Sequence, residues 1–134
     1  MFKKLMLALV LLGSVPAFAQ GEPNGTYLPD LMKQPAYGAA WKGMLSGERV
    51  PPWVKKFSAT HGATSAPSKP IAVGGEPYTL GWICKPHDCG DNQVYVLFAP
   101  GERQAWGLLI SGDKRSWLGR PDPAIQAAIL SGVE

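Results

Sequence analysis

The pattern of apolar positions first indicates a helix after Pro35. Apolar residues there recur at intervals of three and four, which places them on one face of an α-helix. Gly47 follows the last of them and is suited to end the helix. We therefore predict a helix that packs on the core through Tyr37, Ala40, Trp41, Met44 and Leu45.

A second, shorter helical turn is predicted over residues 51–57. It begins with two prolines, which suit the first turn of a helix, and its aromatic residues Trp53 and Phe57 are expected to face inward. Residues 58–69 are rich in Ser, Thr, Ala and Gly and predict a polar loop. His61 lies within this loop and is expected to be solvated and without a role.

Five segments in the middle of the chain are typical of strands, because they are rich in β-branched, aromatic and leucine residues. Turn sequences at 74–75, 100–102 and 112–114 are short enough for hairpins. Neighbouring strands are therefore expected to run antiparallel, in a meander of about five strands. The predicted strands cover residues 71–73, 78–84, 94–98, 105–110 and 117–118.

The C-terminal region predicts another helix. Asp122 suits the N-cap, and Pro123 suits the first helical position. Ile125, Ala128 and Ile129 then form a stripe that is expected to face inward. Helix, sheet and helix in this order predict an α+β domain, in which helices cover at least one face of the antiparallel sheet.

The start of the chain resembles an export signal. Lys3 and Lys4 precede an apolar run at residues 5–12 that is too short to span a bilayer, and a small-x-small cleavage sequence ends at Ala19. We predict a secretory signal peptide over the first 19 residues, cleaved after Ala19. Residues 20–134 are then a single domain, which is expected in the bacterial periplasm.

The charge of the predicted mature chain is close to neutral. The full sequence has 13 basic and 10 acidic residues and a net charge of +3, and Lys3 and Lys4 leave with the signal peptide. The remaining charge of +1 gives no strong field for nucleic acid, so no nucleic-acid partner is expected. The mature chain also has no apolar run long enough for a membrane span.

The two cysteines of the chain enclose four residues, in the connection between the predicted strands 78–84 and 94–98. An oxidising compartment and an even number of cysteines predict a disulfide between them. A ring this short contributes only about 2 kcal/mol of stability, so its main effect is to fix the shape of what it encloses. The loop consists of Cys84, Lys85, Pro86, His87, Asp88 and Cys89.

The residues inside the ring favour recognition over packing. Pro86 fixes its own φ and restricts Lys85. His87 can donate from either ring nitrogen when protonated, and Asp88 is a neighbouring acceptor that could orient it. A protruding, disulfide-closed loop that is ordered before it binds avoids that ordering cost on binding. Gly90 is expected to let the chain turn into the next strand.

The loop also has other interpretations, some of which its sequence disfavours. It is a structural clip if His87 is only solvated. A metal site of Cys84, His87 and Cys89 is disfavoured, because three ligands and a proline crowd into six residues. A thiol oxidoreductase is disfavoured because its motif is C-x-x-C before a helix, and a disulfide-bonded cysteine offers no nucleophilic thiolate. A periplasmic redox or metal-handling protein is kept as the alternative from another class.

Residues 84–90, with the sequence CKPHDCG, resemble the characteristic loop of the inhibitor of vertebrate lysozyme (Ivy) family. The resemblance extends upstream to AWKGM at 40–44 and PPWVKK at 51–56, which are similar to the helix of the family and the segment that follows it. It also covers the strands on both sides of the loop. In all, residues 35–110 carry the resemblance.

The resemblance implies a periplasmic inhibitor of c-type lysozyme, active in host-defence evasion, that works without catalysis, a metal or a cofactor. It implies that residues 84–89 are the inhibitory loop and that His87 occupies the catalytic cleft of the enzyme. Cleavage of this type uses two carboxyl groups in the cleft, to which an imidazole on a rigid tip could donate. Regulation of the cell's own lytic transglycosylases is the alternative within the same class. The exposed edges of an antiparallel sheet leave a homodimer open.

Overall fold

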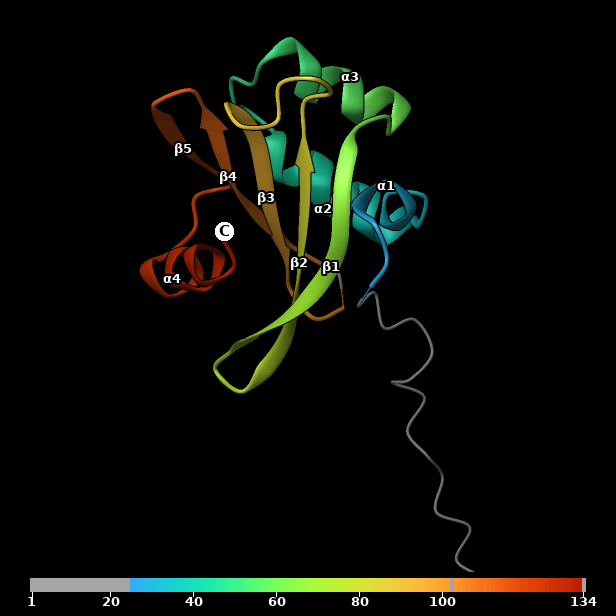
Figure 1. Cartoon of the computed structure of the whole chain (residues 1–134). Coiled ribbons are helices and arrows are strands. Elements are labelled where there is room, and N and C mark those ends of the chain that lie inside the picture. Colours follow the sequence, from blue (N-terminus) through green and yellow to red (C-terminus); the bar gives the residue numbers. More distant parts are fainter. Residues whose placement is uncertain (1–24, 102, 134) are drawn as a thin grey trace, which may run out of the picture.

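The computed structural model describes residues 25–101 and 103–133, and the predicted signal peptide lies outside them. Within these residues the chain forms an antiparallel sheet in the order β1-β2-β3-β4-β5, together with four helices (Figure 1). The prediction of an α+β fold built on an antiparallel meander is confirmed. The strands are β1 (Thr64–Val73), β2 (Glu76–Cys84), β3 (Asn92–Phe98), β4 (Ala105–Ser111) and β5 (Lys114–Leu118). The helices are α1 (Leu28–Leu31), α2 (Pro35–Leu45), α3 (Pro52–Thr60) and α4 (Pro123–Ser131).

The helix predicted after Pro35 is α2, and it ends at Leu45. Gly47 follows with a φ of 76°, in the left-handed region that glycine adopts readily. The predicted apolar face is buried, and its fully or nearly buried side chains are Tyr37, Ala40, Trp41 and Met44.

The predicted C-terminal helix is α4, and its cap is as expected. The Asp122 carboxylate accepts a hydrogen bond of 2.9 Å from the backbone N–H of Ile125, which satisfies a donor that the first helical turn leaves free. Ile125, Ala128 and Ile129 are buried. The prediction of an inward stripe on this helix is confirmed.

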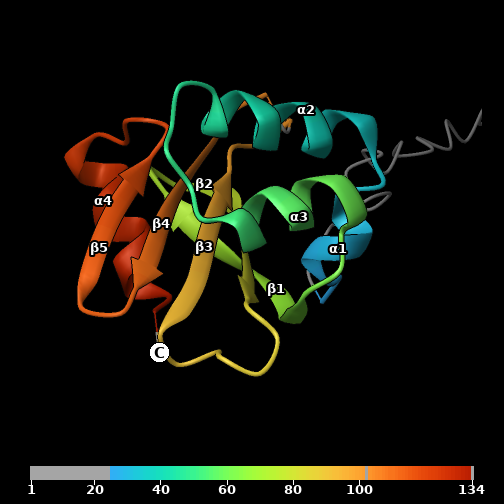
Figure 2. The same ribbon diagram turned by 90° about the horizontal axis from the view of Figure 1, so that it is seen from above.

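The sheet has helices on both faces (Figure 2). Side chains alternate along a strand, so β3 sends Val94 and Val96 into a core with α1, α2 and α3. Tyr95 and Leu97 point the other way, into a second core with α4. The β2–β3 connection lies at one end of this packed body, and the rigid strands on either side hold it in place.

The prediction of a polar loop over residues 58–69 was wrong. Helix α3 continues to Thr60, and β1 begins at Thr64. β1 is an edge strand whose side chains are exposed or half-buried, apart from the buried Ser68, so its sequence needs no apolar alternation. It also tolerates Pro67 and Pro70, because an edge strand has N–H groups that need no partner, and its register shifts near Pro67.

The expectation that His61 is solvated and without a role is met only in part. His61 is half-buried and ends α3 in the left-handed conformation, with a φ of 55°. Its backbone N–H donates to the carbonyl of Phe57 at 2.7 Å, and the two rings lie 6.0 Å apart. His61 is therefore a helix cap, a role that normally falls to glycine.

The outer strands β1 and β5 leave two edges on the sheet, and the homodimer suggested by such edges stays a prediction. Across residues 25–101 and 103–133, the structure contains no helix with the length and apolar character needed to cross a membrane.

Candidate functional site

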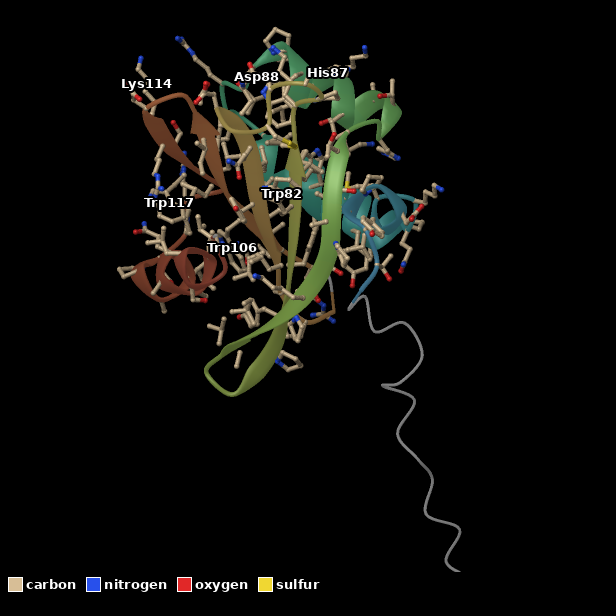
Figure 3. All side chains as sticks on the ribbon, in the orientation of Figure 1. Trp82, His87, Asp88, Trp106, Lys114 and Trp117 are labelled. Atoms are coloured by element: carbon tan, nitrogen blue, oxygen red, sulfur yellow. A yellow bond between two sulfur atoms is a disulfide. The ribbon has the colours of Figure 1, made fainter. Side chains whose placement is uncertain are left out.

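The disulfide predicted between Cys84 and Cys89 is present, with the two Cα atoms 4.9 Å apart. Cys84 is the last residue of β2 and is fully buried, whereas Cys89 is half-buried. The four residues that the disulfide encloses are all exposed. Figure 3 shows His87 and Asp88 at one end of the molecule, beyond the sheet. The ring is thus anchored in the core at one end and presents its contents to solvent.

A tight turn forms the apex of this ring. The N–H of Asp88 donates to the carbonyl of Lys85 at 3.1 Å, with Pro86 second and His87 third in the turn. His87 has a φ of 65°. Proline in the second position and a positive φ in the third are typical of a type II turn, whose third residue is normally glycine or asparagine. A histidine held there costs about 1 kcal/mol, and residues held in this way cluster at functional sites.

Gly90 was expected to let the chain turn into the next strand, and it lies in a turn just before β3. Gly90 does not have a positive φ, and the residue that does is His87. Pro86 suits the second position of a type II turn, and His87 takes the third position, which needs a positive φ. The turn therefore projects the imidazole from its most constrained position.

Asn92 joins the two arms of the loop. Its carbonyl accepts from the N–H of Lys85 at 3.0 Å. Its side-chain nitrogen donates to the Asp88 carboxylate at 2.8 Å and lies 3.4 Å from the Asp88 carbonyl. Orientation of His87 was one role open to Asp88, and the hydrogen-bond partner that the structure gives its carboxylate is Asn92. Sequence reasoning missed Asn92, whose only signal was a polar residue at the start of an apolar strand.

The loop is also supported by the β4–β5 hairpin. The N–H of Gly112, in the hairpin turn, donates to the carbonyl of Asp91 at 2.7 Å. Lys114, at the start of β5, lies at the same end of the molecule as His87 and Asp88 (Figure 3). A partner that covers the loop would therefore meet this hairpin as its neighbour.

The disulfide contains both cysteines of the chain, so neither side chain is a free thiol. A metal site of Cys84, His87 and Cys89 would need thiolate ligands, which this bond removes. Within the described part of the chain, no group of three His, Cys, Asp or Glu side chains is placed to hold a metal ion.

Comparisons with known proteins identify the family of the chain. The family model described as Inhibitor of vertebrate lysozyme (Ivy) matches residues 36–127. A protein of Pseudomonas aeruginosa named Inhibitor of vertebrate lysozyme is 40% identical over 111 residues, which cover 79% of this chain and 68% of that protein. A protein of the same name from Escherichia coli K12 is 30% identical over 116 residues, with 87% and 69% covered. An uncharacterised protein of Yersinia pestis is 34% identical over 121 residues, with 80% and 76% covered. The chain belongs to the inhibitor of vertebrate lysozyme (Ivy) family.

Proposed function

We propose that this protein inhibits c-type lysozyme by inserting the loop of residues 84–89 into the catalytic cleft, with His87 as the group that meets the catalytic carboxyls. The observation that carries this proposal is the exposed His87 at the apex of a disulfide-closed turn. The names of the relatives from Pseudomonas aeruginosa and Escherichia coli support the choice of target.

The chemistry of the cleft suits an imidazole. A lysozyme holds one carboxyl group that stays protonated and one that is ionised. Protonated His87 has a donor on each ring nitrogen, so it can donate to both carboxyl groups at once. Each such charge-assisted hydrogen bond contributes about 1.5–3 kcal/mol. A nanomolar complex needs about 12 kcal/mol, so contacts beside the loop must supply the rest.

The order of the free loop favours binding. A flexible loop loses conformational freedom when it binds, which weakens the complex. Here the disulfide, the turn from Lys85 to Asp88 and the Asn92 hydrogen bonds hold the loop before any partner arrives. The β4–β5 hairpin beside it is the nearest candidate for the additional contacts.

The place of action follows from the same proposal. A lysozyme that attacks the cell wall of a Gram-negative bacterium reaches its substrate in the periplasm, so an inhibitor is effective there. The predicted signal peptide, cleaved after Ala19, would deliver the chain to that compartment.

The test compares the two histidines of the chain. Both have a positive φ, but His87 lies at the loop apex and His61 ends α3. We expect His87→Ala to weaken inhibition of c-type lysozyme by at least about tenfold, while His61→Ala leaves the inhibition constant unchanged. The readout is the rate of cell-wall lysis at increasing inhibitor concentration. Unaltered inhibition by His87→Ala would exclude insertion of His87.

The same assay on a lytic transglycosylase decides between the two targets in this class. Inhibition of the lysozyme alone supports the proposal. Inhibition of the transglycosylase alone would assign the loop to the cell's own murein hydrolases instead.

A further inference from the structure

Gln93 makes three hydrogen bonds with its side-chain amide at the base of the loop. Its oxygen accepts from the indole N–H of Trp82 at 2.9 Å and from the hydroxyl of Tyr95 at 3.2 Å. Its nitrogen donates to the carbonyl of Gly90 at 3.2 Å. One side chain thus connects strands β2 and β3 to the residue that follows the disulfide ring.

The partners of Gln93 fix which way its amide points. The indole N–H of Trp82 can only donate, so it must face the amide oxygen, and the Gly90 carbonyl can only accept, so it must face the nitrogen. An amide satisfies both neighbours at once. A leucine satisfies neither, and an ionised glutamate satisfies only the donors.

The Gln93 amide is held by hydrogen bonds more than by close packing, because it borders an open space. Gln93, Trp82 and Tyr95 all border a cavity of about 450 Å³ on the α4 side of the sheet. The Trp82 and Tyr95 rings lie opposite one another on the paired strands, with centroids 6.4 Å apart, and so provide a fixed base. Figure 3 shows Trp82 on the sheet beneath the end that carries His87.

The bond to Gly90 acts where the loop would otherwise be free to swing. Cys84 is fixed in β2, but Gly90 and Asp91 are exposed and precede the start of β3. Two hydrogen bonds hold this stretch, one from Gln93 to Gly90 and one from Gly112 to Asp91. We expect the loss of either bond to loosen the angle between the ring and the sheet.

We propose that Gln93 is a positioning residue for inhibition, which fixes the angle of the disulfide ring, and so of His87, by holding the Gly90 carbonyl. The role rests on the proposed function, because it acts through His87. Gln93 itself contacts the loop backbone and the sheet, and it need not touch the enzyme.

The first test pairs Gln93→Leu with Gln126→Leu. Gln126, on α4, is a matched control, because its side-chain amide also donates to a backbone carbonyl, that of Pro121 at 3.1 Å. Gln93→Leu removes all three side-chain hydrogen bonds, but only the bond to Gly90 reaches the loop. We therefore expect it to weaken inhibition about fivefold, and Gln126→Leu to leave inhibition unchanged. Equal inhibition by Gln93→Leu and the unaltered protein would overturn the proposal.

Gln93→Glu separates the loop bond from the bonds to the sheet. The carboxylate still accepts from Trp82 and Tyr95 but cannot donate to Gly90. We expect it to weaken inhibition as much as Gln93→Leu does, and it carries the test if Gln93→Leu fails to fold. The amide hydrogen of Asp88 should exchange faster in this variant while the melting temperature stays the same. Full inhibition by Gln93→Glu would overturn the proposal.

A double-mutant cycle with His87→Ala shows whether Gln93 acts through the loop histidine. We expect Gln93→Leu to cause no further loss in the His87→Ala background. An equal loss in both backgrounds would overturn the positioning role and leave the proposed function standing. If His87→Ala itself causes no loss, the proposed function fails, and the positioning role fails with it.

Discussion

The side-chain nitrogen of Asn92, at the start of β3, lies 2.8 Å from a carboxylate oxygen of Asp88 in the disulfide loop. This contact leaves the neighbouring imidazole of His87 exposed at the apex. The loop thus uses its acidic residue for its own shape. Changes at this pair should therefore affect the order of the loop before they affect the stability of the domain.

The first prediction concerns Asn92→Ala. It removes the side-chain donor to Asp88 and keeps the backbone bond between the Asn92 carbonyl and Lys85. We expect inhibition of c-type lysozyme to weaken about fivefold, or about 1 kcal/mol, because the lost hydrogen bond is exposed and acts only by ordering the loop. The inhibition constant measures the effect, and a thermal melt serves as the control. A fall in melting temperature with no change in inhibition would mean that the pair supports the fold alone.

The left-handed conformation of His87 yields a second prediction. Glycine adopts this region without strain. We therefore expect the free energy of unfolding of His87→Gly to be about 1 kcal/mol higher than that of His87→Ala. Both variants should lose inhibition, because both lack the imidazole. Urea denaturation and the lysis assay on the same samples provide the two measurements. If the two variants are equally stable, the turn at His87 is not held in solution.

The disulfide yields a third prediction. A ring that spans Cys84 to Cys89 adds only about 2 kcal/mol to stability. We expect the order of the loop of residues 84–89 to depend on the disulfide more strongly, so reduction should weaken inhibition by more than the roughly thirtyfold that this free energy represents. Titration and a thermal melt with and without reductant measure both effects. A parallel fall of equal size would show that the disulfide is mainly a structural clip.

Asp122 provides the opposite case. Its carboxylate caps α4, far along the chain from the loop, through the bond to the Ile125 N–H. We expect Asp122→Ala to lower the free energy of unfolding by about 1 kcal/mol without any change in the inhibition constant. Denaturation of the variant beside the lysis assay checks this. Weakened inhibition in a fully folded Asp122→Ala sample would link α4 to the binding surface.

Much of the fold could be predicted because its signals are local. The residues that form the apolar face of α2 lie close together in the sequence, and so do the residues that cap the start of α4. Only residues 71–73 of β1 were predicted as a strand, because β1 lies at the edge of the sheet, where polar residues and proline carry little penalty. The four-residue α1 is too short to leave a periodic pattern.

Part of the candidate site could also be predicted from local sequence, and part could not. The disulfide and the exposure of His87 follow from the spacing of two cysteines and the residues between them. The hydrogen bonds of Gln93 that support the loop could not be predicted from the sequence. Trp82 and Gln93 are 11 positions apart and meet only through the register of β2 and β3. Gly112 is more distant still, and its bond to Asp91 depends on the β4–β5 hairpin.

The crystal structure of the complex with a c-type lysozyme tests the central claim most directly. The account predicts that the loop of residues 84–89 fills the catalytic cleft, with the ring nitrogens of His87 at hydrogen-bond distance from the two catalytic carboxyl groups. A complex in which this loop faces solvent, or in which the cleft stays open, would contradict it.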